Sequence, residues 1–283
     1  MSSTESSVGG FWRRFRRNRP AVFALGMLVA IVLVALLAPL AYPGDPFAIV
    51  ARPFLPPFHD HLFGTDQLGR DVAAGIARGA MTSLLIGIVA TVCAMLIGVV
   101  TGGAAGYFGG RTDVLLMRMT EAFQTIPAFI FAIVLVAILS PSLESTIIAI
   151  ATVSWPPMTR LVRGEFLATK NREFVQACRS IGMSDARVIL RHILPNCASP
   201  IIVTGSLMVA TAILIESGLS FLGLGDANLM SWGYLIGAGR TVLRTAWWVC
   251  AFPGLAILLT VLSINLFGEG LNDALNPRLR EAG

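Results

Sequence analysis

Long apolar stretches divide this chain into segments of the length that crosses a lipid bilayer. A spanning helix needs about 20 mostly apolar residues. We therefore predict membrane helices over residues 21–42, 81–107, 122–139, 145–162, 200–222 and 246–267. The fourth run contains Pro156 and Pro157, which remove backbone donors and are expected to kink it.

The second apolar run is rich in small residues, including Gly98, Gly102, Gly103 and Gly106. Small side chains let two helices approach closely in lipid. We interpret these glycines as a packing face and not as a chemical site.

The composition supports a chain that lies mostly in lipid. It is 55% hydrophobic and 13% charged over 283 residues, whereas soluble domains carry roughly 25% charged residues. The four cysteines show no spacing typical of a disulfide framework or a zinc site. The net charge of +5 alone would suit nucleic acid, but its distribution fits membrane topology better.

Basic residues gather on one side of the predicted membrane. If the N-terminus is cytoplasmic, sixteen of the 21 Lys and Arg residues lie in inside segments. The outside segments hold Arg52, Arg70, Arg78, Arg240 and Arg244. This bias predicts that both termini are cytoplasmic, and it gives no reason to expect a nucleic-acid partner.

The basic segment 1–20 mixes arginines with Phe11, Trp12 and Phe15. It is expected either to lie in the membrane surface as a short helix or to be a basic tail that only sets topology. The run after it is long for a signal peptide, and residues 39–41 do not form a cleavage site. We therefore expect a retained helix.

A charged segment, Glu173–Asn196, lies between two apolar runs. Residues 173–181 read as a helix that Gly182 ends, because glycine adopts the left-handed conformation readily. Ser184 is a natural N-cap for a second helix over 186–194, which is expected to stop near Pro195.

The second helix carries two kinds of side chain. Val188, Ile189 and Ile193 offer apolar contact, and Arg187 and Arg191 add charge. Such a segment is either an element that docks on a soluble partner or a surface hairpin that only connects two spans. The residues alone leave both readings open.

The same segment resembles the coupling loop, or EAA loop, of ABC importer permeases. That pattern is E-A-A, three residues, G, nine residues and I-x-L-P. Gln176, Ala177 and Cys178 fill the E-A-A places, and Gly182 is in register. Leu194 and Pro195 are also in register, whereas His192 replaces the isoleucine.

Further motifs resemble the C-type subunit of the dipeptide/oligopeptide/nickel permeases, and the likeness covers nearly the whole chain. They are His61-Leu62-Phe63-Gly64-Thr65-Asp66 with Leu68-Gly69-Arg70-Asp71, Trp155-Pro156 with Arg160-Leu161-Val162-Arg163, Leu219-Ser220-Phe221-Leu222-Gly223-Leu224-Gly225, and the tail from Asn265 to Pro277.

The resemblance implies an all-α polytopic membrane protein with a type I ABC importer permease-like bundle of six transmembrane helices. Its expected parts are the cytoplasmic segment 1–20, the first helix 21–42, the periplasmic loop 43–80 and the permease core 81–283, which includes the coupling loop 163–199. The implied partners are a second homologous permease, two ATPase subunits, an extracytoplasmic solute-binding protein and the lipid bilayer. The implied location is the bacterial cytoplasmic membrane.

ATP chemistry is expected in a partner. The chain has no G-x-x-x-x-G-K-[ST] loop, so ATP and Mg²⁺ would be held by the ATPase subunits, and this chain is expected to be neither an enzyme nor a cofactor-binding protein. By resemblance, the residues that couple to the ATPases are Gln176, Ala177, Gly182, Ser184, Asp185, Arg187, Arg191, Leu194 and Pro195.

Glu216 is a charged residue well inside a predicted span, so it is a candidate for the pathway. The simpler interpretation is structural, with Glu216 reaching outward or bonded to Ser217, Ser220 or nearby backbone. His59, Asp60 and His61 could contact a metal, but two close histidines rarely make a site alone. We therefore predict no metal site.

The expected function is uptake of di- or oligopeptides through half of a translocation pore. The same architecture could instead carry nickel chelates, glutathione or opines. A stand-alone channel would not need the coupling loop. An intramembrane enzyme is disfavoured because no H-E-x-x-H motif, no pair of facing aspartates and no nucleophile–base pair lies in the spans.

Overall fold

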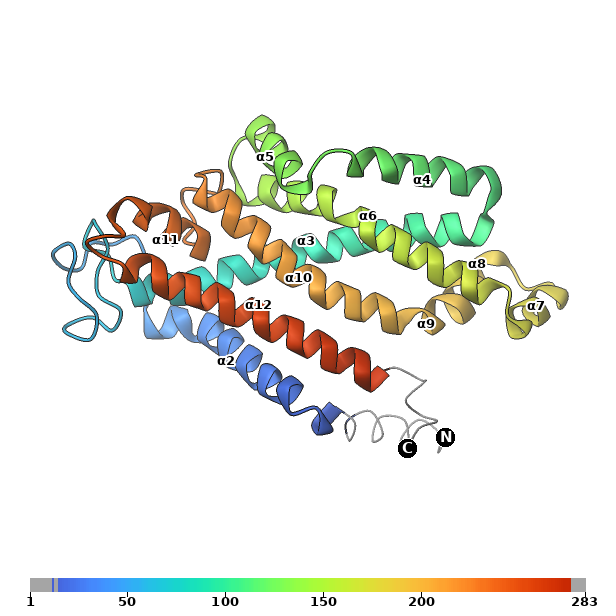
Figure 1. The fold of residues 1–283 in the computed structure, drawn as a ribbon, viewed down its shortest axis with the longest axis horizontal. Helices are drawn as coiled ribbons and strands as arrows, with labels where there is room; N and C mark the ends of the chain where they lie inside the picture. Colours follow the sequence, from blue (N-terminus) through green and yellow to red (C-terminus); the bar gives the residue numbers. More distant parts are fainter. Residues whose placement is uncertain (1–11, 13–14, 276–283) are drawn as a thin grey trace.

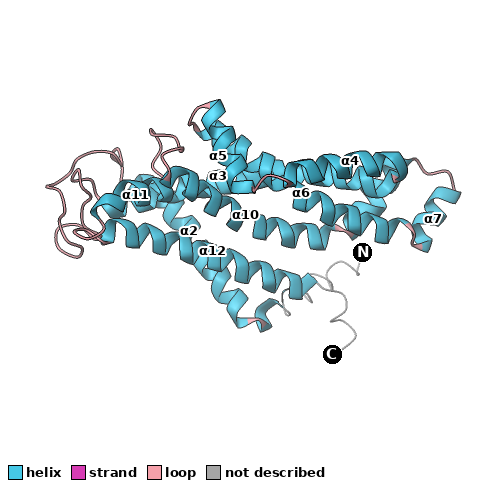
Figure 2. Cartoon of the chain, turned by 45° about the horizontal axis from the view of Figure 1, so that its top comes forward, coloured by secondary structure: helices cyan, strands magenta, loops and turns pink. Residues whose placement is uncertain are grey.

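The structure is a computed structural model that describes residue 12 and residues 15–275. Helices joined by loops make up the described part of the chain (Figure 2), which has no strands apart from an isolated bridge between Thr65 and Asp71. Figure 1 shows an elongated bundle with loops gathered at one end and α7 and α8 at the other. The elements are α2 (Arg19–Ala41), α3 (Val72–Phe108), α4 (Gly110–Gln124), α5 (Ala128–Leu139), α6 (Leu143–Lys170), α7 (Glu173–Ser180), α8 (Asp185–Val188), the π-helix η1 (Ile189–Ile193), α9 (Leu194–Asn196), α10 (Ala198–Phe221), α11 (Trp232–Gly239), the 3₁₀-helix η2 (Arg240–Val242) and α12 (Trp248–Leu275).

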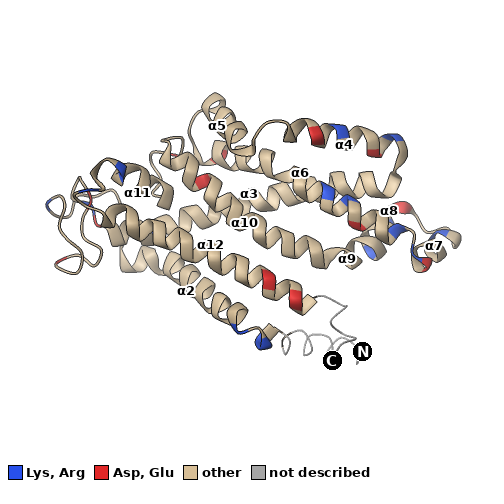
Figure 3. Ribbon diagram, viewed as in Figure 1, with Lys and Arg blue, Asp and Glu red and all other residues tan. Residues whose placement is uncertain are grey.

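Four helices, α2, α3, α10 and α12, are long and apolar enough to cross a membrane. The bent pair α4 and α5 gives a fifth candidate span. The charged residues of the described chain lie mainly near the two ends of the bundle and along α4 (Figure 3). This arrangement fits a multi-pass membrane protein, while the count of six spans and the side of each terminus stay predictions.

The expected helix over residues 122–139 is wrong as a single element. The chain breaks after Gln124 and turns by 83° before α5 begins at Ala128. The cause is local, because Pro127 disfavours helical backbone at the residue before it. Its own backbone is extended (φ −53°, ψ 126°).

The prolines of the fourth run do not end its helix. α6 continues through Pro156 and Pro157 and reaches Lys170, beyond the expected end at residue 162. Membrane helices tolerate proline where neighbouring helices support the freed backbone, and α3 lies along α6 here (Figure 1). Residues 163–170 are therefore helical although they were expected to belong to the coupling loop.

The glycines of α3 let it lie directly against α6. A Cβ atom added at Gly102 would lie 2.4 Å from the carbonyl oxygen of Thr159, and one at Gly106 would lie 2.6 Å from Cβ of Phe166. One at Gly98 would lie 2.7 Å from the facing side chain. These distances are too short for any side chain, so the predicted packing role is confirmed.

The start of the described chain packs on its end. Phe15 is buried, and its ring meets Phe267 of α12 edge to face at 5.8 Å. Ala21 and Ala274 complete this cluster. Phe15 therefore faces the bundle and not lipid, which corrects part of the expected membrane-surface helix; Phe11 lies outside the described residues.

Candidate functional site

The segment predicted to be cytoplasmic, Glu173–Asn196, begins with a short helix that glycine ends. After α7, Gly182 has φ +75°, its N–H donates to the carbonyl of Arg179 at 2.9 Å, and the N–H of Met183 donates to the carbonyl of Cys178 at 3.1 Å. Both bonds together form a Schellman motif, which satisfies the last carbonyls of the helix. Gly182 thus ends α7 as predicted.

The second helix differs from the expectation at its start. Ser184 occupies the N-cap position of α8, but its side chain makes no capping hydrogen bond, and only its carbonyl accepts from the N–H of Val188. At the other end, the helix stops at Asn196, one residue after Pro195, as predicted. The preceding π-helix η1 leads into α9, where Pro195 lies in the first turn and needs no N–H partner.

Three valine and isoleucine side chains anchor this segment to the bundle. Val175, Val188 and Ile193 are all fully buried. They pack in one cluster with Tyr107 of α3 and Phe166 of α6. The expectation that Val188 and Ile193 present apolar contact to a partner is therefore wrong, since their own core covers them.

The exposed face of the segment carries other apolar residues. Ile181 is 77% exposed and Leu190 is 65% exposed. Arg187 and Arg191 are also exposed and form no ion pair with the described residues. Sequence reasoning missed Leu190, although its position three residues after Arg187 places it on the arginine face. We call these four residues the exposed face.

Residues near the C-terminal end of α3 contact the segment and the end of α6. The Tyr107 hydroxyl donates a hydrogen bond to the Asp185 carboxylate, and the guanidinium of Arg179 lies 4.7 Å above the Tyr107 ring. Lys170 Nζ donates to the carbonyl of Gly106 at 2.7 Å. The position of Asp185 is therefore fixed by α3 as well as by its own helix.

An ion pair joins α4 to α6 near the same end of the bundle. Arg163 donates through Nε and Nη2 to both carboxylate oxygens of Asp113, the second at 2.7 Å. This two-point contact fixes geometry better than a single bond does. It ties α4 to α6, the helix that leads into the Glu173–Asn196 segment.

The remaining predicted coupling residues fall into two groups. Gln176 and Ala177 of α7 are exposed, as is Pro195. Leu194 instead packs against the buried cluster that contains Ile193. The structure thus brings the predicted residues together in one segment, Glu173–Asn196, but only some of their side chains are exposed. We call this segment the hairpin.

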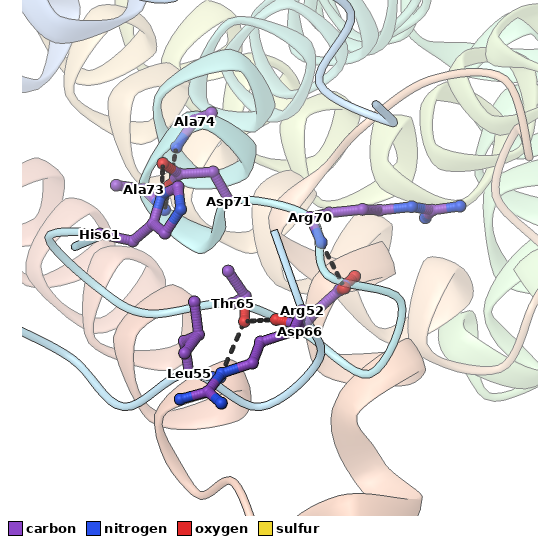
Figure 4. Close-up of polar contacts among 9 residues, drawn as sticks. All are labelled: Arg52, Leu55, His61, Thr65, Asp66, Arg70, Asp71, Ala73 and Ala74. Carbon is purple, nitrogen blue, oxygen red and sulfur yellow. Dashed lines mark hydrogen bonds and ion pairs between the residues drawn. The ribbon is translucent and has the colours of Figure 1, made fainter. Parts of the chain in front are cut away.

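The loop between α2 and α3, which is predicted to be the outer loop, is an ordered scaffold around two polar residues (Figure 4). Oδ1 of Asp66 accepts from the N–H groups of Leu68 and Arg70 at 2.8 and 2.9 Å. Thr65 Oγ1 accepts from the N–H of Leu55 and donates to the carbonyl of Arg52. These bonds close the turns on which α3 begins.

Two glycines make this loop possible. Gly64 and Gly69 have φ +73° and +81°, and a Cβ at either would lie 2.3 and 2.0 Å from the carbonyl oxygens of Leu55 and Ala51. Asp71 then caps α3 through the N–H of Ala73 at 2.8 Å. The glycines and aspartates of the motif over residues 61–71 therefore shape this loop and the start of α3.

His61 belongs to the same scaffold. Its Nδ1 lies 2.8 Å from Oδ2 of Asp71 (Figure 4). Among the described residues no group of three His, Cys, Asp or Glu side chains could hold a metal ion. His61 thus orients the cap of α3.

Two known protein families match parts of this chain. Residues 94–281 match the family described as binding-protein-dependent transport system inner membrane component, and residues 7–61 match the N-terminal TM domain of oligopeptide transport permease C. The chain belongs to the family of binding-protein-dependent transport system inner membrane components. It is a multi-pass permease of the bacterial inner membrane.

Relatives of the permease cover nearly its whole length. It is 43% identical over 273 residues to a putative peptide transport system permease protein of Brucella abortus, which spans 96% of this chain and 92% of the relative. It is 41% identical to the dipeptide transport system permease protein DppC of Bacillus subtilis, over 95% of this chain and 85% of the relative.

Solved transporter structures share the fold of the permease. An inward-facing structure of the MetNI methionine ABC transporter matches with a TM-score of 0.59 and 16% identity, over 73% of this chain and 95% of the other. An amino acid ABC transporter matches with a TM-score of 0.54 over 70% and 92%. The expected fold class, a type I ABC importer permease, is therefore confirmed.

Glu216 lies inside the permease bundle. It is fully buried, and its carboxylate accepts hydrogen bonds from Ser220 at 2.8 Å, Ser83 of α3 at 3.1 Å and Ser217 at 3.3 Å. The N–H of Trp232 donates to Ser83 Oγ at 3.3 Å. Glu216 thus links α10 to α3 and to the start of α11, and it does not reach outward.

Proposed function

We propose that this chain is one of two permease subunits in an ATP-driven importer of di- or oligopeptides. The observation that carries the proposal is about 40% identity, along nearly the whole chain, to proteins named as peptide and dipeptide permeases. Nickel chelates, glutathione and opines are not favoured by these names. The second permease completes the pore.

The ATPase partner docks on the exposed face, in this proposal. Ile181 and Leu190 supply apolar surface, and Arg187 and Arg191 supply positive charge that pairs with no described acidic residue. An apolar centre with charged neighbours is typical of a protein interface. ATP and Mg²⁺ belong to that partner, and a solute-binding protein delivers the cargo from the opposite side.

Several predicted coupling residues have an indirect role in this proposal. Gly182, Ser184 and Asp185 shape the hairpin, while Leu194 and Pro195 join it to α10. Gln176 and Ala177 lie on the exposed side of α7 and contact the partner at its edge. Glu216 holds the bundle together and binds no cargo.

A reconstitution experiment tests the proposal. The chain would be expressed with its second permease, ATPase subunits and binding protein and placed in liposomes with ATP inside, and uptake of a labelled dipeptide would be followed. We expect ATP-dependent uptake that requires the binding protein.

Replacing Leu190 and Arg191 by Ala should abolish uptake and release the ATPase subunits. Replacing Leu115 on α4 by Ala is the matched control, since it is a leucine of similar exposure outside the hairpin (63%). Uptake of another cargo but no peptide would reject the peptide assignment alone. Normal assembly of the hairpin variant would reject the docking site.

A further inference from the structure

A cavity of about 390 Å³ lies at the outer-loop end of the bundle. The start of the loop, α3 and the segment before α11 enclose it, and its lining includes Asp45, Phe47, Arg78, Thr82 and Asn228. Sites for small ligands have volumes of roughly 300–1,000 Å³ and a few converging polar groups. We call this space the outer cavity.

Two opposite charges line the outer cavity without pairing. Asp45 and Arg78 form no ion pair, with each other or with any other described residue. Arg78 donates through Nε to the carbonyl of Tyr42 and through Nη2 to that of Gly44, both at 3.2 Å. Asp45 Oδ1 accepts from the N–H of Phe47 at 2.9 Å.

These backbone contacts hold each side chain in place but leave part of each charge free. Within the described part of the chain, Nη1 of Arg78 and Oδ2 of Asp45 have no hydrogen-bond partner. Two separated charges of opposite sign, fixed in one cavity, match a small molecule that carries both an ammonium and a carboxylate.

We propose that the outer cavity binds short peptides with free termini as they enter the permease. The Asp45 carboxylate receives the α-ammonium group, and the Arg78 guanidinium receives the α-carboxylate, for which a planar fork of donors is suited. This inference rests on the proposed peptide function and assigns the site and the chemical groups that are recognised.

The wall of the cavity beside these charges is rigid. The ring of Phe47 lies 5.1 Å from the guanidinium of Arg70 and 5.5 Å from the ring of Tyr234. Arg70 in turn donates to the Tyr234 hydroxyl at 3.1 Å. A wall fixed in this way lowers the ordering cost of binding a ligand.

Glu216 lines a neighbouring space but is not the ligand site. The space beside it is about 10 Å³ and shares Thr82 and Leu229 with the outer cavity. This volume holds at most about one water molecule. Of these two spaces, the outer cavity is the one with room for a peptide.

The test uses the complete transporter in liposomes with its binding protein and ATP. Uptake of one dipeptide would be compared in three forms, unmodified, N-acetylated and C-amidated, each normalised to the amount held by the binding protein. The variants are Asp45→Asn and Arg78→Gln. Asp60→Asn and Arg52→Gln are matched controls, because both residues are exposed on the same loop and do not line the cavity.

We expect each variant to slow uptake only of those peptides whose corresponding terminus is free. Asp45→Asn slows uptake of the unmodified and amidated forms by about 3- to 10-fold and leaves the acetylated form unchanged. Arg78→Gln slows the unmodified and acetylated forms by a similar factor and leaves the amidated form unchanged. The two control variants behave as the wild type.

Other results overturn the inference in distinguishable ways. A variant that slows all three forms equally, or none, shows that the charge recognises no terminus. Arg78→Lys guards against misfolding, because it keeps the charge and should retain most of the preference for a free carboxylate. If the wild type takes up no form of the peptide, the proposed function fails and the inference falls with it.

Discussion

The Tyr107 hydroxyl, at the end of α3, donates a hydrogen bond to the Asp185 carboxylate in the first turn of α8. This bond joins a long bundle helix to the hairpin proposed to carry the ATPase. We predict that Tyr107→Phe loosens the hairpin at a cost of about 1–2 kcal/mol. ATPase stimulation by the loaded binding protein should fall at least twofold while basal hydrolysis persists.

Tyr42→Phe is the control for that experiment. The Tyr42 side chain makes no hydrogen bond to the described residues, and its contact with Arg78 uses the backbone carbonyl. Equal stimulation in the Tyr107→Phe variant and the wild type would mean that the bond has no part in coupling.

Gly182 offers a test of backbone conformation alone. A Cβ added there meets nothing within 4 Å, but φ is +75°, so Gly182→Ala brings strain of about 1–2 kcal/mol without a clash. We expect weaker ATPase binding, measured by co-purification, and recovery in Gly182→Asn, because asparagine tolerates this conformation.

Gly164→Ala is the matched substitution in the neighbouring helix. It also meets nothing within 4 Å, and its φ is not positive, so alanine should preserve assembly. If Gly182→Ala and Gly164→Ala bind the ATPase equally well, the conformation at Gly182 is not required.

The contact between α3 and α6 should not tolerate one added methyl group. A Cβ at Gly102 would lie 2.4 Å from the Thr159 carbonyl oxygen, so Gly102→Ala must push the helices apart at a cost of about 1–3 kcal/mol. The thermal unfolding midpoint in detergent should fall. Gly26→Ala, on α2 with nothing within 4 Å, should leave it unchanged.

The two cysteines near the hairpin should react at different rates. Burial raises the pKa of the Cys197 thiol, which lowers its thiolate fraction at neutral pH, and the thiolate is the reactive form. Cys178 is only half-buried. Peptide mapping after brief maleimide treatment should find Cys178 labelled first, with Cys197 labelled only after denaturation or at higher pH.

The same reaction tests the predicted topology. A membrane-impermeant maleimide should label Cys178 in inverted vesicles and leave it unlabelled in right-side-out vesicles. The opposite pattern would place the hairpin outside and contradict the positive-inside assignment.

Hydrophobic runs were enough to predict α2, α10 and α12 to within a few residues at their starts. The role of Gly182 could also be predicted, because a helix often ends at a glycine in the left-handed conformation. These features depend on local composition, which a single sequence displays directly.

Features that depend on packing between helices could not be predicted from the sequence. Pro156 and Pro157 do not break α6, although proline usually ends a helix, because α3 packs along α6 and supports it. Likewise, Val188 and Leu190 are both apolar, and only the fold decides which is covered.

An unbroken α3 has a mechanical consequence. Its 37 residues make a rod of about 55 Å, with Tyr107 near one end and Arg78 near the other. The glycines of α3 let it lie directly against α6, and the single continuous helix connects its two ends without a break. A tilt imposed on α3 at the hairpin would therefore displace Arg78 at the other end of the same helix.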